Sequence, residues 1–237
     1  MSDATDGPTP VLEFQRVSIG TPPPRCAAVR DANLRLAPGE MALIRTRRDQ
    51  PHSALVPAAE GLWDLDGGSV SFEGEAWSDR SALRHNARRG RIGRVFSGCG
   101  WVSNLNVNEN VTLPERHHTS RSTSEIEAEA ETLAKRFGLP GVPHGRPSFI
   151  PESVLRRAEW VRALLGKRAL LLLEEPMRGV DRKLLPNLVG AVDEARDRGA
   201  AVLWITEDPA VLGHEFRQPL KRLAMRDNEL VTAEEAA

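Results

Sequence analysis

Apolar and polar residues alternate along the first part of the chain, and short runs that are apolar throughout appear later. Residues 11–19 and 28–40 alternate with the period of two that is typical of a strand with one buried face. Residues 41–44 and 169–173 are continuously apolar, which is typical of buried strands, and a further strand is predicted at 200–206. The four consecutive leucines within 169–173 make that run the clearest candidate for a strand buried on both faces of a parallel sheet.

Shorter patterns complete this outline of strands. They predict a turn followed by an edge strand at 67–77, a strand at 91–96, a helix at about 183–198 and a closing hairpin at 222–231. The second half of the chain therefore alternates strand, helix and strand.

Two further stretches have the spacing of amphipathic helices. Apolar side chains recur every three to four positions in residues 124–139, and Ser124 is the expected N-cap. Residues 153–166 show the same spacing, with Ser153 as the expected N-cap and Gly166 as the end of the helix. These stretches place helices in the middle of the chain, between the predicted strands.

Strands near both ends and a mostly helical insert predict an α/β core that carries a helical subdomain. We expect a flexible N-terminus at residues 1–10 and a single domain at 11–237. Its core is expected to comprise about 11–96 and 157–231, and its helical subdomain about 97–156.

Composition limits the classes of function. The net charge of −1 over 237 residues gives no basic field for nucleic acid or an anionic membrane. No apolar run approaches the roughly 20 residues that span a bilayer, and no signal peptide is recognised. The only two cysteines, Cys26 and Cys99, are far apart and argue for a reducing compartment without a disulfide framework. We therefore expect a cytoplasmic protein without a nucleic-acid partner.

The order of segments resembles that of the ATP-binding subunit of an ABC transporter. The stretches LAPGEMALI, VNENVTLP, VRALLGKRALLLLEEPMRGVD and AAVLWITEDPAVL follow one another as in that family. The resemblance covers about residues 11–231, and its most specific part is 161–181. It implies an α/β fold, with a RecA-like P-loop NTPase core, an antiparallel β subdomain and a helical subdomain.

The resemblance also implies partners. Subunits of this family dimerise head to tail, sandwich two ATP molecules and drive a membrane permease. The expected partners are therefore an ABC permease and either a second copy or a competent ATP-binding subunit, with the chain peripheral on the inner face of the membrane. The stretch at 98–114 is similar to the ATPases of lipid-trafficking importers of the mammalian-cell-entry type.

The retained chemistry lies around the buried strand 169–173. By the resemblance, Glu174 takes the place of the Walker B aspartate, which holds Mg²⁺ through water, and Glu175 that of the general base for the attacking water. Asp181 takes the place of the D-loop aspartate, which faces the other subunit. Taken alone, the two glutamates could also end a strand at a solvated surface.

The phosphate loop is not retained. The family pattern needs glycines that let backbone N–H groups wrap the phosphates, a lysine and a hydroxyl. The corresponding loop contains Arg45, Arg47, Arg48, Gln50, Pro51, His52 and Ser53. No glycine remains, and Pro51 removes an N–H where a helix would offer donors to an anion. We expect this loop not to cradle ATP in the usual way.

Other nucleotide-facing positions are also altered. Ser97 stands where the family has the glutamine that senses Mg²⁺ and faces the permease, and Glu207 stands at the switch histidine. Neither the region 18–24 nor the rest of the chain contains a tyrosine on which adenine could stack. The signature positions are Ile150, Pro151, Glu152, Ser153 and Val154. The carboxylate of Glu152 would repel an approaching phosphate.

These losses lead to the hypothesis of a pseudo-ATPase, a structural or regulatory subunit in which ATP and Mg²⁺ are cofactors only if the family activity survives. Two alternatives stay open: a weakly active ATP-hydrolysing subunit, and a soluble scaffold without a permease. We further predict that an arginine of the phosphate loop pairs with Glu174, Glu175 or Glu207. The histidines show no metal-ligand spacing, so no metal site is expected, and the arginine run at 84–94 is interpreted as a solvated face rather than a basic patch.

Overall fold

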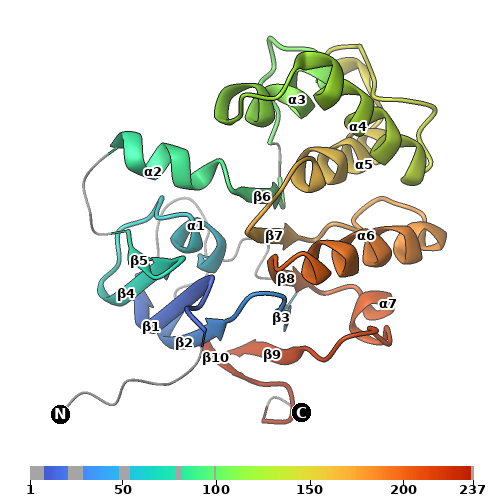
Figure 1. Ribbon diagram of the computed structural model, residues 1–237. Coiled ribbons are helices and arrows are strands. Elements are labelled where there is room, and N and C mark those ends of the chain that lie inside the picture. The colour runs from blue at the N-terminus through green and yellow to red at the C-terminus, as the bar shows by residue number, and fades with distance from the viewer. Residues whose placement is uncertain (1–7, 21–28, 48–53, 78–81, 99, 236–237) are drawn as a thin grey trace.

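The computed structural model describes residues 8–20, 29–47, 54–77, 82–98 and 100–235 (Figure 1). The predictions for Cys26, Cys99 and the loop residues Arg48 to Ser53 lie outside the described residues, as does most of the expected flexible terminus.

The strands of the described ranges form one sheet of ten, in the order β5-β4-β1-β2-β10-β9-β3-β8-β7-β6. Their bounds are β1 Leu12–Ile19, β2 Val29–Leu36, β3 Met41–Arg45, β4 Gly67–Phe72, β5 Glu75–Ala76, β6 Ile92–Val95, β7 Leu170–Glu174, β8 Ala201–Thr206, β9 Lys221–Arg226 and β10 Glu229–Thr232. Strands β3, β8, β7 and β6 are parallel, whereas β1 pairs antiparallel with β2 and β4. The predicted α/β class is confirmed.

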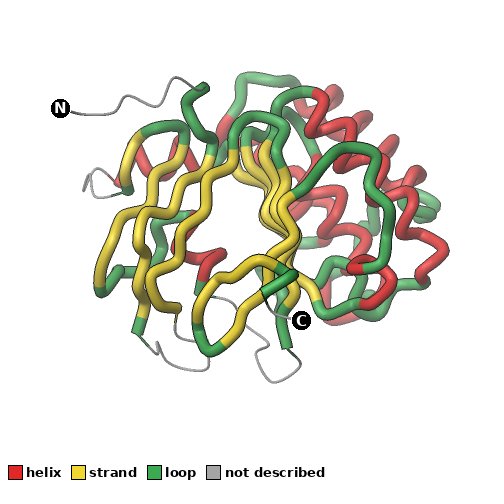
Figure 2. Tube along the Cα trace, turned by 90° about the horizontal axis from the view of Figure 1, so that it is seen from below, coloured by secondary structure: helices red, strands yellow, loops and turns green. Residues whose placement is uncertain are grey.

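The helices lie mainly between β6 and β8. Their bounds are α1 Leu55–Ala59, α2 Ala82–Arg89, α3 Val107–His118, α4 Thr123–Arg136, α5 Glu152–Leu164, α6 Leu185–Asp197 and α7 Pro209–Leu212, with the 3₁₀ turns η1 Pro147–Phe149 and η2 Arg182–Leu184. Every described element between β6 and β7 is helical. Figure 2 shows most of this helical ribbon gathered on one side of the strands.

Strand β7 has every residue buried, as its apolar run predicts. Because side chains alternate across a strand, its leucines divide between two cores. Leu171 and Leu173 pack in the core that includes α3 to α6, whereas Leu170 and Leu172 pack in the core that includes α1, β1 and β2. Burial on both faces fixes the register of β7 and hence the position of the glutamates that follow it.

The two predicted N-caps are wrong by one turn or less. Ser122, not Ser124, caps α4, because its hydroxyl accepts from Glu125 N–H while the Glu125 carboxylate accepts from Ser122 N–H. Pro151, not Ser153, occupies the N-cap of α5. The prediction for Gly166 is confirmed, since it follows the C-cap of α5 with a φ of +78°, a conformation that glycine adopts without strain.

Helix α3 is absent from the sequence-based outline. Its start carried a signal, because Asn106 and Glu109 form a capping box. Pro114 lies inside the helix and argued against a helical interpretation. The predicted edge strand at 67–77 is also two strands, β4 and β5, which are separated by a turn at Glu73 and Gly74 with φ values of +52° and +78°.

Candidate functional site

Several of the predicted site residues lie at one edge of the sheet. Strands β3, β7 and β8 are parallel, so their carboxyl ends meet at the same edge. Glu174 ends β7, Glu207 follows β8, and Arg45 ends β3. Helix α5 leads into the start of β7 through a short connection, so its own N-terminal end, with Glu152, lies toward this carboxyl edge as well.

Glu174 is buried and pairs with an arginine that the sequence analysis did not assign to the site. Arg94 of β6 donates to Glu174 Oε2 from Nε at 3.1 Å and from Nη2 at 2.8 Å. Its Nη1 donates to Glu60 Oε2 at the end of α1. The Arg94 guanidinium also lies 4.3 Å from the centre of the Phe96 ring. One cation therefore bridges two buried carboxylates at the position that the resemblance gives to Mg²⁺.

The interpretation of residues 84–94 as a solvated face is wrong for its inward-facing members. Arg88 donates to Phe72 O at 2.7 Å and lies over the Trp77 ring. Arg89 donates to the carbonyl oxygens of Glu60 and Gly61, each at 2.9 Å. These two arginines therefore donate hydrogen bonds to backbone carbonyl oxygens at the ends of β4 and α1. A signal for Arg94 was available in the sequence, since this arginine lies between the apolar residues of the predicted strand RIGRVF.

Both carboxylate oxygens of Glu175 accept hydrogen bonds. Thr206 Oγ1 donates to Oε2 at 2.9 Å, and the N–H of Glu207 donates to Oε1 at 2.7 Å. Burial raises the pKa of Glu175, and these two donors oppose that rise. The residue has a φ of +45°, a left-handed conformation that is strained for a glutamate. These two hydrogen bonds therefore hold the Glu175 side chain at the end of β8.

The residues that directly follow β3, where the phosphate loop is expected, lie beside Glu207. Arg45 pairs in register with Thr206, and Thr46 N–H donates to Thr206 O at 3.2 Å. Arg45 and Arg47 are exposed at this edge. The prediction that a loop arginine pairs with Glu174, Glu175 or Glu207 stays a prediction, although the cation found at Glu174 comes from β6.

The segment after β6, which begins at Phe96 and Ser97, is held by arginines from other elements. Arg178 donates to Ser97 O at 2.9 Å, and Arg162 donates to Gly100 O at 2.5 Å. Arg156 donates to Phe96 O and also to Glu159 Oε2, the latter at 2.8 Å.

Burial raises the pKa of Glu159 to about 7, against the opposing effect of Arg156 and Arg162. The sequence analysis missed these arginines because helical periodicity places them on α5 without showing which loop they reach.

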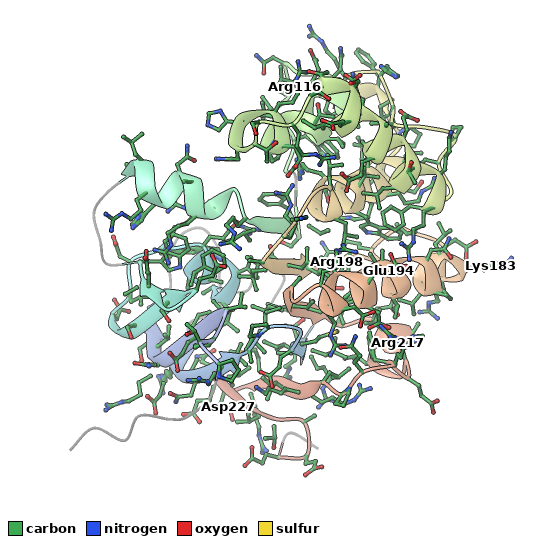
Figure 3. The ribbon with its side chains drawn as sticks, in the orientation of Figure 1. Arg116, Lys183, Glu194, Arg198, Arg217 and Asp227 are labelled. Atoms are coloured by element: carbon green, nitrogen blue, oxygen red, sulfur yellow. The ribbon has the colours of Figure 1, made fainter. Side chains whose placement is uncertain are left out.

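The signature positions lie at the entrance to α5. Ile150 follows η1, Pro151 and Glu152 are exposed, and Ser153 and Val154 are half-buried in the first turn. Asp181 caps η2 by accepting from Lys183 N–H at 2.9 Å. Lys183, labelled in Figure 3, marks the side of the molecule on which α6 begins.

A groove of about 470 Å³ lies between β6 and α3. Phe96, Val102, Leu113 and Pro114 supply apolar surface, and Arg89, Arg94 and Arg162 supply charge. Val102 and Leu113 are each 44% exposed. Five residues of the stretch 98–114, which the resemblance places at the permease, line this groove: Gly100, Val102, Asn110, Leu113 and Pro114.

Within the described ranges, no cluster of three or more histidine, cysteine or acidic side chains is placed to hold a metal ion. None of the helices in these ranges is both long enough and apolar enough to cross a bilayer.

Comparison with known sequences gives no matching family model but many similar proteins. The macrolide export ATP-binding/permease protein MacB of Chromobacterium violaceum is 26% identical over 209 residues, which cover 86% of this chain and 31% of that protein. The Fe(3+) ions import ATP-binding protein FbpC of Streptomyces coelicolor is 28% identical over 205 residues, which cover 86% and 56%. The chain thus spans about a third to just over half of the length of these relatives.

Solved structures match over nearly the whole chain. An ATP-binding subunit of an ABC transporter superposes with a TM-score of 0.78 at 19% identity, covering 95% of this chain and 91% of that one. A dimeric ATP-binding cassette in a post-hydrolysis state with ADP and Pi superposes with a TM-score of 0.79 at 20% identity, covering 92% and 96%. The chain therefore has the fold of an ABC transporter ATP-binding cassette, and most of its sequence is similar to ATP-binding proteins of that family.

Proposed function

We propose that the chain is a non-catalytic subunit of the ABC type, which serves as a structural or regulatory partner of a membrane permease. The observation that carries the proposal is the Arg94 guanidinium on the carboxylate of Glu174. The resemblance assigns this carboxylate to Mg²⁺, and Mg²⁺ is bound in such sites through carboxylates and phosphates. A fixed guanidinium there competes for the same oxygen and repels a divalent cation. The residues present therefore do not fit the Mg²⁺ that ATP hydrolysis requires.

The geometry of Glu175 supports the same conclusion. A raised pKa would by itself suit a general base, so the argument depends on position. A general base must reach the proton of the attacking water with an oxygen, and both oxygens of Glu175 are engaged by Thr206 and by the backbone of Glu207. Freeing one oxygen would cost a charge-assisted hydrogen bond, worth about 1.5–3 kcal/mol.

The permease is proposed from the groove between β6 and α3. Its exposed apolar side chains, Val102 and Leu113, border the half-buried Arg89 and Arg94 and the buried Arg162, as in a surface that receives a partner segment. Several relatives carry names that combine an ATP-binding part with a permease. We propose on this basis that the chain is peripheral at the inner face of a membrane. A lipid-trafficking system of the mammalian-cell-entry type is supported by the stretch 98–114 alone.

Calorimetry with Mg·ATP and a phosphate-release assay test the loss of catalysis. We expect neither micromolar binding nor hydrolysis by the wild-type chain. Micromolar affinity that is abolished by changing Arg47 and Arg48 together, with turnover abolished by Glu175→Gln, would overturn the proposal in favour of a weakly active ATPase. An intact ABC ATPase in the same assays is the positive control.

Membrane association tests the permease partnership. In cells that contain the natural partners, the wild-type chain is expected to sediment with membranes, and Leu113→Glu is expected to shift it to the supernatant. Leu83→Glu is the matched control, because Leu83 is 86% exposed on α2 and does not line the groove. A wild-type chain that stays in the supernatant would favour a soluble scaffold.

A further inference from the structure

A further pocket lies in the antiparallel part of the sheet, where the end of α1 meets β4 and β5 (Figure 1). Its volume is about 290 Å³, and none of its lining residues lines the groove between β6 and α3. Two indole rings, Trp63 and Trp77, line it together with Asp64 and Ser69. We propose that this pocket binds a small quaternary ammonium cation, with Trp63 as the aromatic platform and Asp64 as the opposite charge.

The charge of the pocket favours a cation. Among the described residues that line it, Asp64 is the only charged one. The Asp64 side chain is exposed and has neither an ion pair nor a hydrogen bond in the part of the chain that the structure describes. Arg88 lies over the Trp77 ring, but it does not line the pocket, and it pairs with Glu75 at 4.0 Å. The lining therefore carries a net negative charge, which attracts a cation.

The two tryptophans have different surroundings. Trp77 is fixed, because its Nε1 donates to Ala59 O at 3.0 Å and its ring stacks on Phe72 with ring centres 5.9 Å apart. Gly61 makes room for it, since a Cβ at that position would lie 2.5 Å from the Trp77 ring. Trp63 is half-buried, and no described side chain stacks on its ring. Trp77 thus forms a rigid wall of the pocket, and the indole of Trp63 is left to attract a cation.

The lining selects between kinds of cation. A primary ammonium carries three N–H donors, and each needs an acceptor when it leaves water. Among the described lining side chains, Asp64 and Ser69 are the ones with an oxygen acceptor. A quaternary ammonium has no N–H donor, so an aromatic face and one opposite charge are enough to bind it. The pocket is small for a ligand site, which favours a compact ligand such as choline.

A polar group on the ligand also has partners. The Ser69 hydroxyl and the Trp63 indole N–H line the pocket and make no hydrogen bond within the described ranges. The hydroxyl of choline lies two carbons from its ammonium nitrogen and could bind either group. The inference does not depend on the proposed loss of catalysis, because the pocket is built from other residues.

Titration of the full chain with choline chloride tests the site. The five tryptophan indole N–H signals in ¹H–¹⁵N NMR report binding, and the Trp63 signal is expected to shift with a Kd of about 1 mM or lower. Trp63→Leu and Asp64→Asn are each expected to raise this Kd about fivefold or more. In Trp63→Leu the Trp77 signal serves as the reporter, and circular dichroism checks that each variant is folded.

Two matched controls make the test specific. Asp66→Asn removes the same charge from an exposed residue that does not line the pocket, and it is expected to leave the Kd unchanged. The neutral analogue 3,3-dimethylbutan-1-ol has the shape of choline without its charge, and it is expected to bind at least about fivefold more weakly.

Vesicles distinguish a free ligand from a lipid headgroup. Binding of free choline that depends on Trp63 supports a soluble ligand. Co-sedimentation with phosphatidylcholine vesicles, lost in Trp63→Leu and absent with phosphatidylglycerol vesicles, supports a headgroup. The inference is overturned if the chain responds neither to choline nor to these vesicles, if the neutral analogue binds as tightly as choline, or if Asp64→Asn leaves the Kd unchanged.

Discussion

The end of β7 and the segment that follows β6 are both held by arginines, but the arginines contact different groups in the two regions. At the end of β7, Arg94 neutralises the carboxylate of Glu174, so the group that would bind a metal is satisfied from within. After β6, Arg162 and Arg178 hold backbone carbonyls and leave Val102 exposed. We call the first region closed, because its carboxylate is paired within the chain, and the second region open, because it keeps an exposed apolar side chain. Under the proposed function, the fold keeps a docking surface after its catalytic site has been filled.

Removing the cation at the end of β7 is expected to have the largest effect on stability. Arg94→Met leaves the buried carboxylates of Glu174 and Glu60 without their partner, and breaking such a buried pair typically lowers the free energy of unfolding by about 3–5 kcal/mol. Urea denaturation of the purified chain measures the change. Arg91→Met is the matched control, because its pair with Glu73 is half-exposed and is expected to contribute less than about 1 kcal/mol.

A second variant makes this test specific. The double variant Arg94→Met/Glu174→Met no longer contains the unpaired buried carboxylate of Glu174. It is expected to recover much of the free energy of unfolding that Arg94→Met loses. A loss below about 1 kcal/mol for Arg94→Met alone would mean that Glu174 is stabilised by something other than this pair, and it would remove the argument against Mg²⁺.

The same comparison shows what the sequence could predict. The leucine run predicted β7 and its burial on both faces, because a strand of a parallel sheet must be apolar on both sides. It also predicted where Glu174 and Glu175 lie, since they follow directly along the chain. The same reasoning could not identify the partner of Glu174. Arg94 is 80 residues away in sequence, and only the pairing of β6 with β7 brings the two together.

The helical part was predicted less well, for local physical reasons. Pro114 disfavours a helix at α3, but the capping box at Asn106 and the buried face of the helix outweigh the hydrogen bond that a proline removes. The N-cap of α5 is a proline with no side-chain acceptor, so no capping pattern marked its start. The contacts of Arg156 and Arg162 with the segment after β6 depend on how α5 packs, which periodicity does not specify.

The open region depends on Asn110, so its removal is expected to have the next largest effect. Asn110 accepts from Val102 N–H at 2.8 Å and donates to the carbonyl oxygens of Val102, Leu105 and Asn106 at 3.0–3.2 Å. Asn110 is buried, so Asn110→Ala removes four hydrogen bonds from a buried position and is expected to lower the free energy of unfolding by about 2–3 kcal/mol. Hydrogen exchange should show lost protection at the Val102 amide.

Asn104→Ala is the control in the same loop, because Asn104 is exposed. If Asn110→Ala left exchange at Val102 unchanged, the groove would be held by the arginines alone. The contrast between a closed and a fixed but open region would then rest on Arg162 and Arg178.

The smallest expected effect concerns the pH dependence of the fixed segment. Burial raises the pKa of Glu159 from 4.5 to about 7, so between these values the folded chain holds a proton that the unfolded chain has released. The free energy of unfolding should therefore fall as pH rises, by about 1–2 kcal/mol between about pH 5 and 7. In Glu159→Gln this part of the slope should be absent. Equal slopes for both proteins in urea titrations would show that Glu159 is ionised beside Arg156 throughout, and that the segment after β6 is held by a full ion pair, as the end of β7 is.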